Sequence, residues 1–298
     1  MFPIIPANSA AIEGNKEGIF GYGESYVSMT NLVNAGGVVS SDVTGVGTGR
    51  VGPAACEFGE DEGIFGYGLS GDYKNMSNLV SNTGVVSTDA SGVGTGRYAL
   101  GACKYGGDKG IFAYGHKGGG TGYLTTVNKV GNTGVVAGDS SGAGTARWNT
   151  TACEYGEDKG IFAFGTTGPD PTNPSGNWSN LVSNTGVIAS NATGVGTARR
   201  CLAACSYGGD KGIFGFGSTG SNVGMTNLVS DAGVVAADVT AVGTARYWPG
   251  ATQYGGDKGI FSFGSPSYTN KVSNAGVIAS DVTQVGTNRS QLAACSFN

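Results

Sequence analysis

Short apolar segments alternate with segments rich in Gly, Asn and Asp along the whole chain. In one representative stretch the apolar segments are 202–207, 211–217, 227–230 and 233–237. Their short length and their β-branched and aromatic content predict β-strands. The connections between the first and second segments, and between the third and fourth, contain Gly or Asn, which tolerate positive φ and favour tight hairpins. No window shows a 3.6-residue apolar period, so we expect an all-β protein with almost no helix.

This group of four segments recurs six times, and each copy contains the motif Gly-Ile-Phe in its second segment. The isoleucines of the six motifs are Ile19, Ile64, Ile111, Ile161, Ile213 and Ile260. A repeat of about 40–50 residues made of short strands is typical of the blades of a β-propeller. The first copy begins at Gly18 without a first strand, and the segment that follows Arg289 lacks a second strand. We therefore predict a six-bladed β-propeller of four-stranded blades, in which residues 289–297 complete the N-terminal blade and close the ring.

By this interpretation the 298 residues form one domain, because the six copies follow one another without a linker. We assign residues 12–298 to the propeller and residues 1–11 to an N-terminal extension. The extension has no basic segment, and prolines interrupt its short apolar run, so it looks like neither a secretory signal nor a membrane span. The 57 glycines lie in register with the strand segments, which distinguishes a turn-rich β-protein from a disordered glycine-rich tract.

The order of segments within each copy resembles the kelch family of β-propellers. Each complete copy has an Arg, then a strand of small residues, then an Ile-Phe-x-aromatic-Gly strand and two outer strands, as in 199–237. In kelch propellers the first strand lines the central channel, and the C-terminal end often supplies it to the blade that the N-terminus begins. The resemblance thus implies the same ring closure by residues 289–297. The Gly-Ile-Phe-Gly-Tyr-Gly motif at 18–23 is also similar to arrays in translated marine viral and metagenomic sequences.

The charge and the cysteine content limit which classes of molecule we expect the protein to bind and in which compartment we expect it to fold. The net charge is −4, and the lysines and arginines do not cluster, so we expect no nucleic-acid binding. Five of the six cysteines occupy the same position of the repeat, one per blade, which predicts free buried thiols rather than disulfides. Reduced thiols are compatible with folding in a reducing compartment such as the cytosol, including the folding of a protein that is later displayed on a virion.

An acidic residue and an Arg eight positions later recur in the connection from each fourth strand to the next blade. The pairs are Asp42 with Arg50, Asp89 with Arg97, Asp139 with Arg147, Asp238 with Arg246 and Asp281 with Arg289, and Asn191 replaces the acid before Arg199. A six-fold ring of arginines at the channel mouth would bind an anion through charge-assisted hydrogen bonds. We favour a structural role, in which the acid caps its own turn and the Arg connects neighbouring segments, because a catalytic site usually breaks internal symmetry. One carboxylate per loop falls short of the oxygen ligands that calcium requires, so we expect no metal here.

The connections between strands two and three, and between strand four and the next blade, differ among the copies. Because successive strands alternate in direction, both kinds of connection should emerge on the same face of the ring. Loops on a rigid scaffold commonly bind ligands, and aromatic residues supply contact area at low entropic cost. We predict that this variable face binds a glycan or a protein through Tyr26, Tyr73, Tyr98, His116, Tyr123, Trp148, Tyr247 and Trp248. The alternative is that these aromatic residues only cover the edges of the blades.

Signatures of catalysis are scarce. His116 is the only histidine, and the chain has no Cys-x-x-Cys, His-Glu-x-x-His or P-loop motif, so we expect no catalytic residues, no cofactor and no metal. These features favour a non-enzymatic binding or structural module, of an adhesin-like or virion-surface kind, that assembles into a particle or fibre. One alternative is a sialidase-like glycoside hydrolase, which would place the arginines and a tyrosine such as Tyr98 over the channel. Another is an intracellular kelch-type scaffold that binds proteins.

Overall fold

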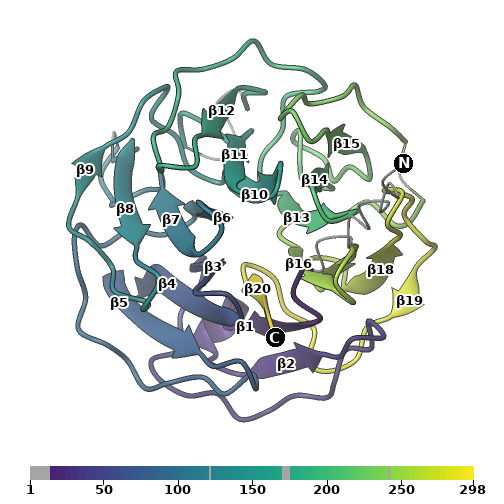
Figure 1. The fold of residues 1–298 in the computed structure, drawn as a ribbon, viewed down its shortest axis with the longest axis horizontal. Coiled ribbons are helices and arrows are strands. Elements are labelled where there is room, and N and C mark those ends of the chain that lie inside the picture. The colour runs from purple at the N-terminus through teal and green to yellow at the C-terminus, as the bar shows by residue number, and fades with distance from the viewer. Residues whose placement is uncertain (1–13, 121, 170–174, 241) are drawn as a thin grey trace, which may run out of the picture.

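Each copy of the repeat folds into one small antiparallel sheet, and the six sheets stand around a common centre (Figure 1). The computed structural model describes residues 14–120, 122–169, 175–240 and 242–298. Within each sheet, consecutive strands lie side by side from the centre of the ring outward. Six antiparallel sheets of three or four strands in this arrangement are consistent with the six-bladed propeller that the repeat predicts.

Three strands recur in every sheet. The inner strands are β3 (Ala54–Phe58), β6 (Gly101–Tyr105), β10 (Thr151–Tyr155), β13 (Ala203–Tyr207), β16 (Gly250–Tyr254) and β20 (Ala293–Phe297). The second strands are β1 (Glu17–Gly21), β4 (Glu62–Ser70), β7 (Lys109–Ala113), β11 (Lys159–Ala163), β14 (Lys211–Gly215) and β17 (Lys258–Ser262). The third strands are β2 (Thr30–Val33), β5 (Asp72–Val80), β8 (Thr126–Val130), β12 (Ser179–Val182), β15 (Thr226–Val229) and β18 (Tyr268–Val272). A short 3-10 helix, η1 (Glu24–Tyr26), lies between β1 and β2.

The N-terminal and C-terminal strands share one sheet, whose order is β2-β1-β20. Strand β1 pairs with β20 in an antiparallel register that runs from Glu17 opposite Phe297 to Gly21 opposite Ala293. The predicted completion of the N-terminal blade by the C-terminal strand is therefore confirmed. Because β20 covers it, β1 does not present an open sheet edge on its inner side.

The prediction of a regular fourth strand is wrong for four of the six sheets, which have three strands. There the outer segment, such as 233–237, follows the third strand only through isolated bridges, for example between Val229 and Val235. Side-chain hydrogen bonds replace part of the backbone ladder, because the amide of the buried Asn227 donates to the carbonyl of Ala236 (3.0 Å). A short fourth strand is present in two sheets, as β9 (Ser140–Ser141) and β19 (Val282–Thr283).

The hydrophobic core lies between neighbouring sheets. Each Phe of the Gly-Ile-Phe motif is fully buried and meets an aromatic ring of the adjacent blade edge-on; the ring centroids of Phe112 and Tyr67, for example, are 5.2 Å apart. Gly66 allows this approach, since a Cβ there would lie 2.8 Å from the Phe112 ring. The Phe of each motif therefore packs between two blades. The six ring pairs are Phe20–Phe263, Tyr22–Phe65, Tyr67–Phe112, Tyr114–Phe162, Phe164–Phe214 and Phe216–Phe261.

The five cysteines at the repeated position are free and buried, as the repeat predicts, and Cys201 is buried as well. The Sγ atom of Cys56 faces Gly110 on the second strand of the next blade, and Cys205 faces Gly259 in the same way. Burial raises the pKa of the Cys205 thiol to about 12. The thiol therefore stays neutral near pH 7 and packs as a small apolar group.

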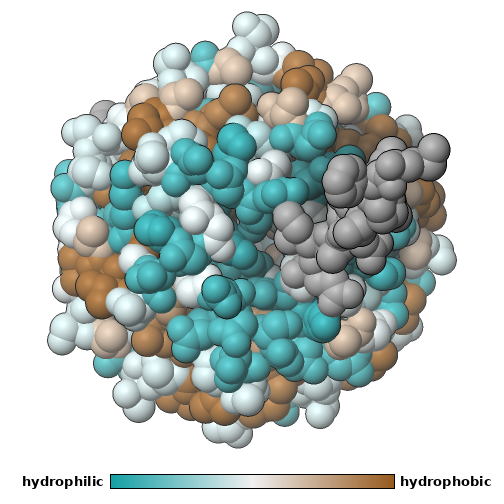
Figure 2. All heavy atoms as spheres, viewed as in Figure 1, coloured by the Kyte–Doolittle hydropathy of each residue, from teal (hydrophilic) through white to brown (hydrophobic). Residues whose placement is uncertain are grey.

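The surface is polar near the ring centre and apolar at intervals around the rim. Figure 2 shows hydrophilic residues around the centre of one face and hydrophobic residues toward its edge. One repeated valine at the start of each outer segment is 58–67% exposed. These rim valines are Val38, Val85, Val135, Val187, Val234 and Val277. The rim thus presents the same apolar side chain once per blade.

Candidate functional site

Five aromatic side chains, one from strand β5 and four from three connections, form one continuous group, which we call the aromatic cluster. The ring centroids of Tyr98 and Trp148, which each follow a repeated arginine, lie 5.5 Å apart. The His116 ring lies 5.9 Å from that of Tyr98 and 5.3 Å from that of Trp148. Tyr73 contacts Tyr98 and His116, whereas Tyr123 contacts His116 and Trp148. Backbone bridges from His116 to Tyr98 and to Tyr123 hold these segments together.

Two residues of the aromatic cluster, Tyr98 and Trp148, also line a surface depression with a volume of about 380 Å³. Its lining consists of Glu24, Ser25, Tyr26, Val51, Leu69, Tyr98, Trp148, Asn149, Trp248 and Gln291. Trp248 also lines the central channel, so the depression lies at the channel mouth, and we call it the mouth depression. The indole N–H of Trp148 donates to the carbonyl of Gly168 (3.0 Å), which fixes the orientation of this ring. A volume of this size is typical of sites that bind small molecules.

The floor of the mouth depression rests on a ring of backbone hydrogen bonds. The residues two positions after the repeated arginines all have left-handed φ between 52° and 57°. Five hydrogen bonds connect these residues in sequence around the channel; for example, the N–H of Asn149 donates to the carbonyl of Ala99 (2.8 Å). The ring consists of Gly52, Ala99, Asn149, Cys201, Trp248 and Gln291. Side chains at this position therefore project from a backbone that is held on both sides.

The structure brings seven of the eight predicted binding residues into these two groups. Tyr26, Tyr98, Trp148 and Trp248 line the mouth depression, and Tyr73, His116 and Tyr123 complete the aromatic cluster. Tyr247 belongs to neither group and forms a backbone bridge with Ser265.

Sequence reasoning missed Glu24, Asn149 and Gln291, which also line the mouth depression. Asn149 and Gln291 belong to the one column after the repeated arginine in which every copy has a different residue. The variation at this position was the feature of the sequence that could have identified these two residues.

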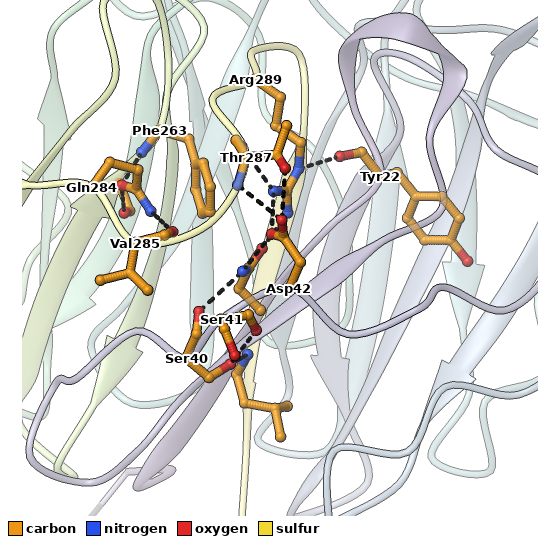
Figure 3. Close-up of polar contacts among 12 residues, drawn as sticks. Tyr22, Ser40, Ser41, Asp42, Phe263, Gln284, Val285, Thr287 and Arg289 are labelled. Atoms are coloured by element: carbon orange, nitrogen blue, oxygen red, sulfur yellow. Dashed lines mark hydrogen bonds and ion pairs between the residues drawn. The ribbon is translucent and has the colours of Figure 1, made fainter.

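The repeated acid and arginine join neighbouring blades in contacts that we call seams (Figure 3). Where the ring closes, the Asp42 carboxylate accepts hydrogen bonds from the backbone N–H and the hydroxyl of Thr287 (2.9 and 2.7 Å). The Arg289 guanidinium lies 4.2 Å from the centroid of the Phe263 ring, and its Nε donates to the carbonyl of Tyr22 (2.9 Å). Phe263 and Thr287 come from the sixth copy of the repeat, Tyr22 and Asp42 come from the first, and Arg289 begins the C-terminal segment that completes the first blade. The seam thus joins the two ends of the ring.

The expectation that each acid caps its own turn is wrong. Asp89 accepts hydrogen bonds from the N–H and hydroxyl of Thr48 (3.0 and 2.7 Å), and Thr48 belongs to the preceding copy. Asn78 on the third strand holds the same carboxylate (2.9 Å), because the Gly-Thr turn of one blade runs against the outer part of the next. The six repeated arginines are 0–4% exposed. They lie between blades rather than in an open ring at the channel mouth.

One seam contains an amide in place of the carboxylate. Asn191 accepts a hydrogen bond from the N–H of Thr145 (3.1 Å) and donates one to its hydroxyl (2.6 Å). Arg147, which belongs to this seam, is fully buried. In the neighbouring seam a carboxylate oxygen of Asp238 lies 3.6 Å from Nη1 of Arg199. Arg147 therefore lacks the counter-charge that Arg199 has.

Replacing Asn191 by Asp should raise the free energy of unfolding by about 1 kcal/mol at pH 7, because hydrogen bonds to a charged acceptor are stronger. At the equivalent Asp238, burial alone would raise the pKa, but hydrogen bonds from Thr197 and Asn227 outweigh it and lower the pKa. The gain should therefore exist above the unfolded-state pKa and disappear as the pH falls through the lower folded-state value. Urea unfolding at pH 7 and pH 3 measures this, with Asp238→Asn as the matched control that should lose a similar amount. A destabilised Asn191→Asp variant would contradict this account of the seams.

Charged residues occur in the central channel, where the inner strands converge. The channel has a volume of about 120 Å³ and is lined by residues of all six inner strands, including Glu57, Lys104 and Glu154. The Lys104 ammonium lies 3.6 Å from the Glu57 carboxylate. Burial raises the pKa of Glu154, and the negative charge of Glu57 adds to this effect, while Lys104 opposes it. Burial lowers the pKa of Lys104, but the two carboxylates outweigh burial and raise it.

Replacing Glu154 by Gln should stabilise the protein at pH 8 by about 1–2 kcal/mol, since each pKa unit corresponds to about 1.4 kcal/mol. A carboxyl whose folded-state pKa is raised holds its proton longer in the folded state. It therefore costs stability as the pH rises from the unfolded-state pKa through the folded-state value. The Gln variant should have a flatter profile of unfolding free energy between pH 5 and pH 8. The exposed Glu60→Gln serves as control. A Glu154→Gln profile parallel to wild type would contradict the prediction.

Within the described ranges of the chain, no group of three or more His, Cys, Asp or Glu side chains could hold a metal ion. In that same part of the chain, no helix has the length and apolar character needed to cross a membrane. A scan against protein-family models finds no matching family, and a search of curated proteins finds no similar chain. Function is therefore inferred from the chemistry of the mouth depression and the aromatic cluster.

Proposed function

We propose that this protein is a non-enzymatic binding module that recognises a glycan or a protein surface through the mouth depression and the aromatic cluster. The observation that supports this most is the convergence of Tyr26, Tyr98, Trp148 and Trp248 on one depression, although they lie far apart in the sequence. Aromatic rings held in fixed orientations provide stacking surfaces at low entropic cost. In this proposal, the blades that carry the binding face have the strand order of a kelch-like propeller, with a fourth strand that is shortened or absent.

Display on a particle or fibre, in the manner of an adhesin or a virion-surface protein, is the second part of this proposal. The six rim valines support it, since they repeat an exposed apolar contact around the ring and leave the mouth depression free.

A sialidase-like hydrolase fits this geometry less well. Such an enzyme holds the carboxylate of its substrate with arginines that reach an open cavity. Here the repeated arginines are buried, and the Arg199 guanidinium is occupied by Asn227, Thr197 and the carbonyl of Phe216. No Arg or Lys is among the described residues that line the mouth depression.

Replacing Trp148 and Trp248 together by Ala should weaken binding at least tenfold without unfolding the ring, because both rings line the mouth depression. A glycan array, paired with a general glycosidase assay and a pull-down of protein partners, identifies the ligand class. Trp178→Ala is the matched control, since Trp178 lies outside the mouth depression and should leave binding unchanged. Turnover of a sugar would favour the hydrolase, and full-strength binding by the folded double variant would contradict the proposed site.

A further inference from the structure

One polar side chain of the mouth depression is buried without a hydrogen-bond partner. Asn149 is 2% exposed, and neither its Oδ1 nor its Nδ2 has a partner within the structure. It lines the mouth depression directly after Trp148. A buried amide left unpaired costs about 1–3 kcal/mol, so its retention calls for an explanation.

The backbone of Asn149 is held by hydrogen bonds on both sides, which fixes the position of its Cα. Its φ is 53°, its N–H donates to the carbonyl of Ala99 (2.8 Å), and its carbonyl accepts the N–H of Cys201 (3.2 Å). The equivalent ring position in the preceding copy is Ala99, with φ of 52°. The ring therefore forms without an amide at this position, and the fold does not require the Asn149 side chain.

We propose that the mouth depression binds one neutral pyranose unit of a glycan. In this proposal the Asn149 amide forms hydrogen bonds with two neighbouring hydroxyl groups of the sugar. The inference rests on the proposed binding function and narrows its ligand class. An amide offers both donors and acceptors, which is what a pair of sugar hydroxyls needs, since each hydroxyl can donate and accept. The sugar stacks its apolar face on the Trp148 or Trp248 ring, as aromatic residues in such sites do.

The charge of the mouth depression selects a neutral sugar over an anionic one. Glu24 is the one charged side chain among the described lining residues. Its Oε2 accepts a hydrogen bond from the hydroxyl of Ser290 (2.8 Å), which holds the carboxylate in place. A sialic acid carboxylate placed there would meet this like charge without a cation to balance it.

The test compares wild type with Asn149→Ala and Asn149→Asp on an array of neutral and sialylated glycans, followed by calorimetric titration of the methyl glycoside of the terminal sugar that binds best. We expect a neutral glycan to bind and both variants to weaken its binding at least tenfold. Asn149→Asp keeps the shape of the side chain, removes its donors and adds a negative charge, whereas Asn149→Ala removes the amide without adding charge. Asn149→Ala should melt close to the wild-type temperature, because the gain from removing an unpaired buried group is offset by the cost of Ala at a left-handed φ of 53°. Asn184→Ala, in an exposed turn outside the depression, is the control.

The outcomes separate this inference from the proposed function. Preference for sialylated glycans, unchanged affinity of the folded Asn149 variants, or binding of a protein in place of any glycan would overturn the neutral-sugar inference. In each of these cases, loss of binding in the Trp148→Ala/Trp248→Ala variant would still support binding at the mouth depression. Binding that survives both the tryptophan and the Asn149 substitutions would overturn the inference and the proposed site together.

Discussion

Removing residues 288–298 should prevent the chain from folding into a stable monomer. The deletion takes away β20, which pairs with β1 over five residues, from Glu17 opposite Phe297 to Gly21 opposite Ala293. It also removes Arg289, whose contacts join the last blade to the first. The inner edge of β1 would become an unpaired strand edge, which is a template for association with another chain. We expect aggregation or self-association in place of a cooperative monomeric melt, measured by circular dichroism and light scattering.

The matched control is a permuted chain in which residues 288–298 precede Asn15 through a short Gly-Ser linker. Lys16 donates its N–H to the carbonyl of Asn298 (2.8 Å), so the two ends are close enough to be joined as a hairpin. The permuted chain keeps every strand pairing and should melt close to the full chain. A truncated chain that stays monomeric and melts like the full chain would show that closure by β20 contributes little.

Replacing Phe162 by Ala should lower the free energy of unfolding by about 3–5 kcal/mol, because a fully buried ring is lost and a cavity remains. The Phe162 ring meets Tyr114 of the adjacent blade edge-on at 5.4 Å. It also packs against Gly101, where an added Cβ would lie 2.9 Å from the ring. The Phe162 ring is thus closely packed against two residues of the adjacent blade, and little collapse into the cavity is possible.

Chemical denaturation of Phe162→Ala measures this loss. Val187→Ala in the same blade is the control, since Val187 is 61% exposed and surface substitutions of this kind change stability by about 0.5 kcal/mol or less. A loss below 1 kcal/mol for Phe162→Ala would mean that the interfaces between blades relax easily and are not the main source of stability.

Three of the four predicted strands could be read from local pattern, and the fourth could not. The segments at 202–207 and 211–217 correspond to β13 and β14, because alternation and bounding glycines are properties of consecutive residues. The segment 233–237 has the same β-type composition, but the Asn227 amide takes the carbonyl of Ala236. Since Asn227 lies nine residues away from Ala236, that competition is invisible to a short window.

Part of the candidate site could be predicted from the sequence. Variable connections that carry Tyr98, Trp148 and Trp248 were sufficient to predict an aromatic face. Asn149 was missed because neither burial nor an unpaired amide can be seen before the neighbouring blades are in place.

By itself, the sequence determined the number of blades, the order of their strands and the closure of the ring by the C-terminal strand. These are properties of a repeat that one chain displays six times, and the two incomplete copies at its ends complement each other. Only the tertiary structure determined which residues of different copies of the repeat come together. Asp89 binds Thr48 rather than a residue of its own turn, and Tyr26 and Trp248 line the same depression. The spacing of residues within one copy of the repeat cannot reveal such pairings, because they depend on how each blade packs against the next around the ring.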